Sequence, residues 1–100
     1  MIDDMISTAG TLCEAARIIK EKGARSVRGA ATHAVLAGPA LERLKSSPFT
    51  EIVVCDTIPI SNDIRKTLPN LVVLSVADIL GEAIARIHKD QSISSLFHHA

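Results

Sequence analysis

The sequence has few aromatic residues, few cysteines and no net charge, and each shortage excludes a class of function. Its 100 residues include two Phe and no Trp or Tyr, so stacking surfaces for nucleic-acid bases are not expected. Eleven basic residues balance eleven acidic ones, so no overall field favours nucleic acid or an anionic membrane. No apolar run approaches the ~20 residues of a membrane span, and Asp3 and Asp4 stand where a signal peptide would be basic.

Cysteine and histidine show neither disulfide nor metal-site patterns. Cys13 lies in a helical pattern and Cys55 ends an apolar strand pattern, so both are expected to be buried and reduced, as suits a cytoplasmic protein. Zinc-ligand spacing is absent from the four histidines, which are His33, His88, His98 and His99. The apolar content is high for one small domain, at 47%, so some of it is expected to cover a partner subunit or a neighbouring domain.

Hydrophobic periodicity predicts alternating strands and helices. Strand patterns cover residues 1–4, 26–32, 52–55 and 71–74, and helical patterns cover 10–22, 37–46 and 77–89. Residues 56–69 are expected to form a polar, proline-bearing loop. Buried helix faces are expected at Leu12, Ala15, Ala16 and Ile19, and at Ile79, Leu80, Ala83, Ile84 and Ile87. The order predicts a single α/β domain over residues 1–100, with a mainly parallel sheet, flanking helices and a truncated first strand.

The run Asp3-Asp4-Met5-Ile6-Ser7-Thr8-Ala9-Gly10-Thr11 is the most informative part of the chain. Two carboxylates precede a small, hydroxyl-rich loop that leads into a helix, whose free N–H groups and positive dipole end suit a phosphate. Gly10 is expected to adopt dihedrals closed to other residues. The carboxylates can accept hydrogen bonds from sugar hydroxyls or hold a hydrated Mg²⁺. The run therefore predicts a receptor for a phosphorylated sugar.

Each part of this run also has an interpretation that needs no ligand. The stretch from Thr11 to Glu14 fits a capping box, as does the stretch from Ser75 to Asp78. The acidic pair could simply end a strand in a turn. A ligand site is nevertheless supported by the positions of three polar stretches. Asp3–Asp4, Thr32–His33 and Asp56–Thr57 all follow predicted strand ends. In a parallel sheet these ends lie at one edge, where ligands bind.

Four stretches together resemble ribose-phosphate pyrophosphokinases, the synthetases of phosphoribosyl pyrophosphate. The first is the run from Asp3 to Thr11. The other three, in the same order as in that family, are Ala31-Thr32-His33 with Ala37-Gly38-Pro39-Ala40, then Val53-Val54-Cys55-Asp56-Thr57-Ile58-Pro59, and then Ser92-Ile93-Ser94-Ser95-Leu96-Phe97. The first stretch alone would fit phosphoribosyltransferases in general, whereas all four cover nearly the whole chain.

The resemblance implies that the chain is most of the C-terminal phosphoribosyltransferase-like half of a two-domain enzyme. Such enzymes transfer the diphosphate of ATP, with Mg²⁺, to ribose 5-phosphate, and they form hexamers. By position, Ser7, Thr8, Ala9, Gly10 and Thr11 would hold the 5-phosphate, and Asp3 and Asp4 the ribose hydroxyls. Ser7 stands where many relatives carry Asp, a change that removes a negative charge beside the phosphate.

The resemblance also assigns Ser92 and Ser94 to a regulatory phosphate or ADP site between subunits. The alternative is that they only cap a terminal turn while Leu96 and Phe97 pack on the domain. The resemblance assigns no catalytic residue and no main metal ligand to this chain, because the family's ATP site, metal ligands and catalytic loop lie upstream of the matched part. The isolated chain is therefore expected to be inactive.

Three other functions stay open at this point. A signalling receiver domain would use Asp56 as its phosphoacceptor, although no Lys-Pro step follows a late strand. A non-catalytic module would bind a sugar phosphate or self-associate. A base-transferring phosphoribosyltransferase would share the first stretch, but the stretches at Thr32-His33 and from Ser92 to Phe97 argue against it.

Overall fold

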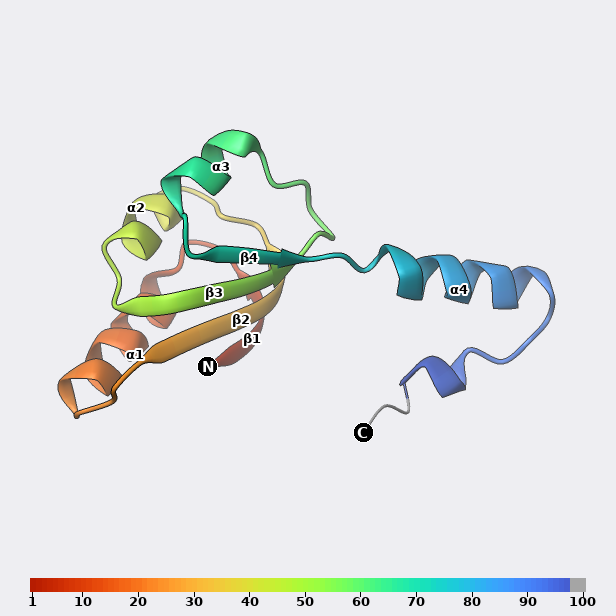
Figure 1. The fold of residues 1–100 in the computed structure, drawn as a ribbon, viewed down its shortest axis with the longest axis horizontal. Helices are drawn as coiled ribbons and strands as arrows, with labels where there is room; N and C mark the ends of the chain where they lie inside the picture. Colours follow the sequence, from red (N-terminus) through yellow and green to blue (C-terminus); the bar gives the residue numbers. More distant parts are fainter. Residues whose placement is uncertain (98–100) are drawn as a thin grey trace.

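Strands and helices alternate along the chain in the computed structural model, which describes residues 1–97 (Figure 1). The elements are β1 (Ile2–Ile6), α1 (Gly10–Glu21), β2 (Val27–Ala34), α2 (Ala40–Lys45), β3 (Phe49–Cys55), α3 (Asn62–Thr67), β4 (Leu71–Leu74) and α4 (Ala77–His88), followed by a short 3₁₀ helix, η1 (Ser94–Phe97). The predicted α/β class is confirmed.

The four strands form one parallel sheet in the order β1-β2-β3-β4. Parallel strands need crossover connections, and these are almost always right-handed. Because each crossover steps in the same direction across the sheet, α1, α2 and α3 lie on the same face. The core forms between this face and the helices. Its buried side chains include Ala31, Ile52 and Val54 from the sheet, Ala16 from α1, Ala40 and Leu44 from α2, and Leu68 after α3.

The opposite face of the sheet has no helix over it in the part of the chain that the structure describes. Its central row runs across all four strands in register, through Ile2, Ala30, Val53 and Val72. Ile2 is 90% exposed, and Leu74 beside the row is also exposed. These five residues, with Cys55, are called the open face below. A shallow apolar cavity of about 200 Å³ lies over part of it.

The structure corrects the predicted elements at β1 and at the segment of residues 56–69. Strand β1 continues to Ile6, so Asp3 and Asp4 lie inside the strand rather than after it, and the strand has an ordinary length of 5 residues. The segment predicted as a loop contains α3. The hydroxyl of Ser61 caps this helix by accepting a hydrogen bond from the N–H of Ile64 at 3.2 Å. Ser61 followed by apolar residues at positions 64 and 68 is a typical helix-start pattern, but the segment was predicted as a loop.

Both predicted capping boxes are wrong. Thr11 already lies within α1, whose N-cap is Ala9 and has no side-chain hydrogen bond. The N-cap of α4 is Val76, and the hydroxyl of Ser75 accepts from the N–H of Ala77 at 3.1 Å instead of capping from the predicted position. The first residue of each helix is set by tertiary contacts, because each helix follows a strand whose end is fixed by pairing with the adjacent strand.

The predicted buried face of α4 is also wrong. Its large apolar side chains, Ile79, Leu80, Ile84 and Ile87, are between 49% and 68% exposed. The helix projects beyond β4 and away from the sheet (Figure 1). The radius of gyration is accordingly 16.1 Å, against about 13 Å for a compact domain of 100 residues. Amphipathic periodicity shows that a helix has an apolar face, but it does not show which surface covers that face.

We expect Ile84→Glu on α4 to change the free energy of unfolding by less than about 0.5 kcal/mol, because its side chain contacts no core. Leu44→Ala on α2, where the side chain is 1% exposed, should cost about 2–5 kcal/mol. Denaturant unfolding at low protein concentration measures both. A cost above about 1 kcal/mol for Ile84→Glu would mean that α4 packs on the domain.

Candidate functional site

The loop between β1 and α1 is built around a left-handed residue. Ala9 has φ 63° and ψ 10°, a region that costs an L-residue about 1–2 kcal/mol. Gly10 begins α1 and does not have a positive φ, so the predicted special dihedral belongs to Ala9 instead. Leu36, also left-handed at φ 51°, donates its N–H to the carbonyl of Ile6 at 2.9 Å. Strained residues are typical of functional loops.

The carbonyl groups of the loop all accept hydrogen bonds from the protein. The carbonyls of Ile6 and Ser7 accept from the N–H groups of Leu36 and Ala37, both at 2.9 Å. The carbonyl of Thr8 accepts from Nη1 of Arg43 at 3.1 Å. The carbonyl of Ala9 accepts from the N–H of Cys13 at 3.0 Å, which is the first bond of the helix.

The N–H groups of the same loop are left without partners. Among residues 1–97, no backbone or side-chain acceptor bonds the N–H groups of residues 7–12. Six successive donors at the start of a helix, with the carbonyls held elsewhere, form an anion-binding arrangement. The loop that was predicted to hold a phosphate therefore presents free N–H donors, while its carbonyl groups are already bonded.

A shallow pocket of about 150 Å³, called the loop pocket below, brings Asp3 next to these donors. Asp3 and Met5 line it together with residues 6–12. Asp4 is not among its lining residues, because successive side chains of β1 point to opposite faces of the sheet. The structure thus brings together six of the seven predicted ligand-binding residues, namely Asp3, Ser7, Thr8, Ala9, Gly10 and Thr11.

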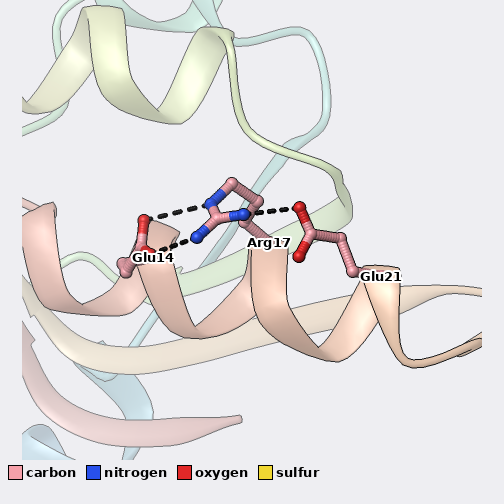
Figure 2. Close-up of polar contacts among 3 residues, drawn as sticks. All are labelled: Glu14, Arg17 and Glu21. Carbon is pink, nitrogen blue, oxygen red and sulfur yellow. Dashed lines mark hydrogen bonds and ion pairs between the residues drawn. The ribbon is translucent and has the colours of Figure 1, made fainter.

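Two arginines lie behind the loop, in a second pocket of about 390 Å³ that is also lined by Ser46 and Ser47. Arg17 is held by Glu14 and Glu21, one helical turn to either side on α1 (Figure 2). These contacts lower the pKa of Glu14, chiefly through the hydrogen bond from Arg17. Arg43 comes from α2 and binds the Thr8 carbonyl instead. Sequence reasoning missed Arg43, since its contact spans 35 residues.

The ends of β2 and β3 meet as predicted. Nδ1 of His33 lies 2.7 Å from Oγ1 of Thr57, and that hydroxyl donates to the carbonyl of Thr32 at 3.4 Å. The acidic pair of β1 lies farther back along its strand, because Asp3 is in register with Ala31 and not with His33. The three predicted stretches therefore converge only in part.

Asp56 fastens the end of β3 to the start of α4. Its carboxylate accepts a hydrogen bond from the N–H of Val76 at 2.9 Å. This bond, followed by one with the hydroxyl of Ser75, holds the pKa of Asp56 below its ordinary value. The carboxylate thus has a structural partner within the chain.

Ser92 and Ser94 lie close together after α4. Their hydroxyl oxygens are 2.9 Å apart, and the N–H of Ser94 donates to the hydroxyl of Ser92 at 3.2 Å. Arg86 joins them by donating to the carbonyl of Ser92 at 3.3 Å and to the hydroxyl of Ser95. Leu96 is half-buried, whereas the side chain of Phe97 and the residues His98 and His99 lie outside what is described.

The described residues hold no ready-made metal centre. Within residues 1–97, no three histidine, cysteine or carboxylate side chains come together as metal ligands. Cys13 and Cys55 are free thiols, and both are half-buried rather than fully buried as expected. Burial raises the pKa of Cys13, an effect that the charge of Arg43 partly opposes. No helix over these residues is long and apolar enough to cross a bilayer.

Fold and site define an α/β domain whose loop after the first strand presents free N–H donors. The chain belongs to the phosphoribosyl synthetase-associated domain family, which it matches over residues 1–98. This membership excludes the receiver-domain interpretation, and with it a phosphoacceptor role for Asp56.

Relatives of the chain carry a consistent name. The chain is 60% identical to a ribose-phosphate pyrophosphokinase of Rhodopirellula baltica, over 97% of the chain and 30% of the relative. It is 55% identical to a ribose-phosphate pyrophosphokinase of Nostoc, over 97% of the chain and 29% of that relative. A crystal structure of phosphoribosylpyrophosphate synthetase from Mycobacterium smegmatis superimposes with a TM-score of 0.84 at 42% identity, covering 89% of this chain and 29% of that one. The chain spans about 30% of these relatives' length.

We expect the amide resonance of Val76 to titrate with the carboxyl group of Asp56 at a pH below 3.8, the ordinary pKa of that group. A lowered folded-state pKa means that the contact stabilises the fold at higher pH and is lost as pH falls through the folded-state value. Asp56→Asn should abolish the titration, because the amide oxygen accepts a hydrogen bond but does not ionise.

The matched control for this titration is Asp78→Asn, which removes an exposed carboxylate from the same helix start and should leave the titration of Val76 unchanged. A Val76 resonance that does not titrate, or that titrates above pH 3.8, would contradict the contact.

Proposed function

We propose that this chain supplies the ribose-5-phosphate pocket of a ribose-phosphate pyrophosphokinase. The observation that carries the proposal is the row of six unpartnered N–H groups at residues 7–12, with Asp3 in the same pocket. A phosphate dianion accepts several hydrogen bonds from such donors and is stabilised by the positive end of α1. The Asp3 carboxylate accepts hydrogen bonds from sugar hydroxyls, so both ends of a sugar phosphate have partners.

The size of the loop pocket supports a ligand of this kind. At about 150 Å³ it is smaller than the ~300–1,000 Å³ of pockets that enclose a whole drug-sized molecule. It accommodates a phosphate group and part of a sugar, and leaves the anomeric carbon open to a second substrate. The hydroxyls of Ser7, Thr8 and Thr11 add donors, and Ser7 contributes no negative charge beside the phosphate.

In the complete enzyme the reaction proposed is transfer of the diphosphate of ATP to ribose 5-phosphate, which gives phosphoribosyl pyrophosphate and AMP. Phosphoryl transfer depends on positioned cations that offset developing charge. Among residues 1–97, no Lys or Arg lines the loop pocket. The described residues therefore bind and orient the sugar phosphate, and the catalytic cations come from the rest of a two-domain enzyme. Residues 1–100 form most of its C-terminal domain in this proposal.

Magnesium fits the loop pocket only if the substrate and water supply most of its ligands. Asp3 supplies a single carboxylate, and Mg²⁺ commonly uses one or two carboxylates together with water and substrate oxygens. Bound there, the ion would neutralise phosphate and diphosphate charge. Asp4 lies on the other face of β1, so its assignment to the ribose hydroxyls rests on the family resemblance alone.

The remaining parts of the proposal concern the whole protein. A cytoplasmic homo-oligomer, a hexamer in the family, is the proposed assembly, with no nucleic acid or membrane as partner. Ser92 and Ser94 are proposed to contribute to a regulatory anion site between subunits. Arg86 supports this role, because it donates to the carbonyl of Ser92 and to the hydroxyl of Ser95 and so brings a cation into this segment, where Glu82 also pairs with it.

A second function is favoured by the exposed apolar surfaces. The chain on its own would act as a binding or self-associating module, because the open face and the apolar side of α4 have no cover within residues 1–97. Both functions share the loop pocket and differ in catalysis. A mass that rises with concentration in light scattering is the observation that identifies self-association.

We expect ribose 5-phosphate, but not ribose, to shift the amide resonances of residues 7–12 in the isolated chain. The phosphate supplies the acceptors that those N–H groups lack, whereas ribose does not. An NMR titration to millimolar ligand measures the effect. Asp3→Asn should weaken binding of ribose 5-phosphate while leaving binding of inorganic phosphate unchanged. If millimolar ribose 5-phosphate shifts none of these amides, the pocket does not bind the proposed ligand.

We expect no AMP when the chain alone is incubated with ATP, Mg²⁺ and ribose 5-phosphate, since the pocket lacks catalytic cations. AMP is measured by chromatography against a full-length relative as positive control. Steady AMP formation that depends on ribose 5-phosphate would show that these residues catalyse without the rest of the enzyme.

A further inference from the structure

We propose that Arg43 is a positioning residue for the sugar-phosphate loop, holding the Thr8–Ala9 peptide so that its N–H faces the loop pocket. The inference rests on the proposed function, because it concerns how the same loop binds ribose 5-phosphate. It assigns a role in that site to a residue of α2, which lies outside the loop and outside its pocket.

The geometry of one peptide group carries the first step. Nη1 of Arg43 donates to the carbonyl oxygen of Thr8 at 3.1 Å, so this carbonyl points toward α2. The peptide bonds of the described chain are all trans, and in a trans peptide the C=O and N–H bonds point in opposite directions. The N–H of Ala9 therefore points away from α2 and toward the loop pocket, where it has no protein acceptor.

This peptide group needs such a restraint more than its neighbours do. The carbonyls of Ile6 and Ser7 are held by backbone donors from the segment after β2, and that of Ala9 by the first bond of α1. In the described part of the chain, the carbonyl of Thr8 is held by a side chain alone. It also precedes the left-handed Ala9, where a flipped peptide would relieve strain. Without Arg43, the donor row would be interrupted at its centre.

Gly10 provides the space for this contact. A Cβ atom built at Gly10 would lie 2.8 Å from Nη1 of Arg43, closer than a carbon atom normally approaches. The guanidinium group therefore lies directly against the first residue of α1. Since Gly10 has an ordinary helical φ, the missing side chain matters here for room and not for backbone freedom.

The charge of Arg43 is available to the loop. Arg17 in the same pocket is paired with Glu14 and Glu21. Arg43 forms no ion pair among residues 1–97. A cation behind the Thr8 carbonyl polarises the peptide and strengthens its N–H as a donor, in the same sense as the helix dipole. Arg43 therefore favours a bound phosphate without touching it.

The experiment measures ribose 5-phosphate affinity and amide shifts by NMR for the whole chain and three variants. Arg43→Met should weaken ribose 5-phosphate about tenfold, the effect of losing one hydrogen bond to a charged group. It should also shift the Ala9 amide before ligand is added. Arg43→Lys, which keeps a cationic donor, should restore affinity to within about threefold. Lys45→Met, the matched control on the same helix, should bind as the unaltered chain does.

Three results decide the inference. A purely structural role would lower the free energy of unfolding of Arg43→Met and would spread shifts into the core around Leu44, which would overturn the proposal. Unchanged affinity and an unchanged Ala9 amide in Arg43→Met would also overturn it. If the unaltered chain fails to bind ribose 5-phosphate but Arg43→Met still shifts the Ala9 amide, the proposed ligand is wrong while the positioning of the loop by Arg43 is supported.

Discussion

The site depends on one constraint: the loop after β1 has every carbonyl tied to the protein and its N–H groups left free. The ties come mainly from the N–H groups of Leu36 and Ala37, in the connection between β2 and α2, and from the side chain of Arg43 on α2. Residues about 30 positions away therefore shape the donor row. Because the β1–β2 pairing brings this connection beside the loop, the parallel sheet is what makes an anion site possible.

The same sheet explains why the domain looks incomplete alone. Its three crossovers cover one face, and the open face, with Ile2 at its edge, remains bare within residues 1–97. The apolar side of α4 is bare as well. Large exposed apolar surfaces mark interaction sites. The chain spans about 30% of the length of its relatives, and both of these surfaces are exposed.

Local chemistry accounts for what could be predicted. Continuous apolar runs such as residues 52–55 and 71–74 locate β3 and β4, and the period of residues 10–22 locates α1. The loop before α1 could also be recognised as a candidate anion site, because small residues before a helix are typical of such sites. Helix α3 was missed because proline and polar residues in residues 56–69 outweighed the short apolar spacing of Ile64 and Leu68. The face of α4 was misjudged because helical periodicity identifies an apolar face without showing whether anything packs on it.

The sequence by itself determined the four strands, the helices α1, α2 and α4, and the family, since all of these follow from short-range patterns. Only the tertiary structure decided that Ala9 takes the left-handed conformation, that Asp3 and not Asp4 lines the loop pocket, and that Arg43 reaches Thr8. The physical reason is that side-chain direction along β1, and contacts between residues 35 positions apart, are set by strand pairing and helix packing.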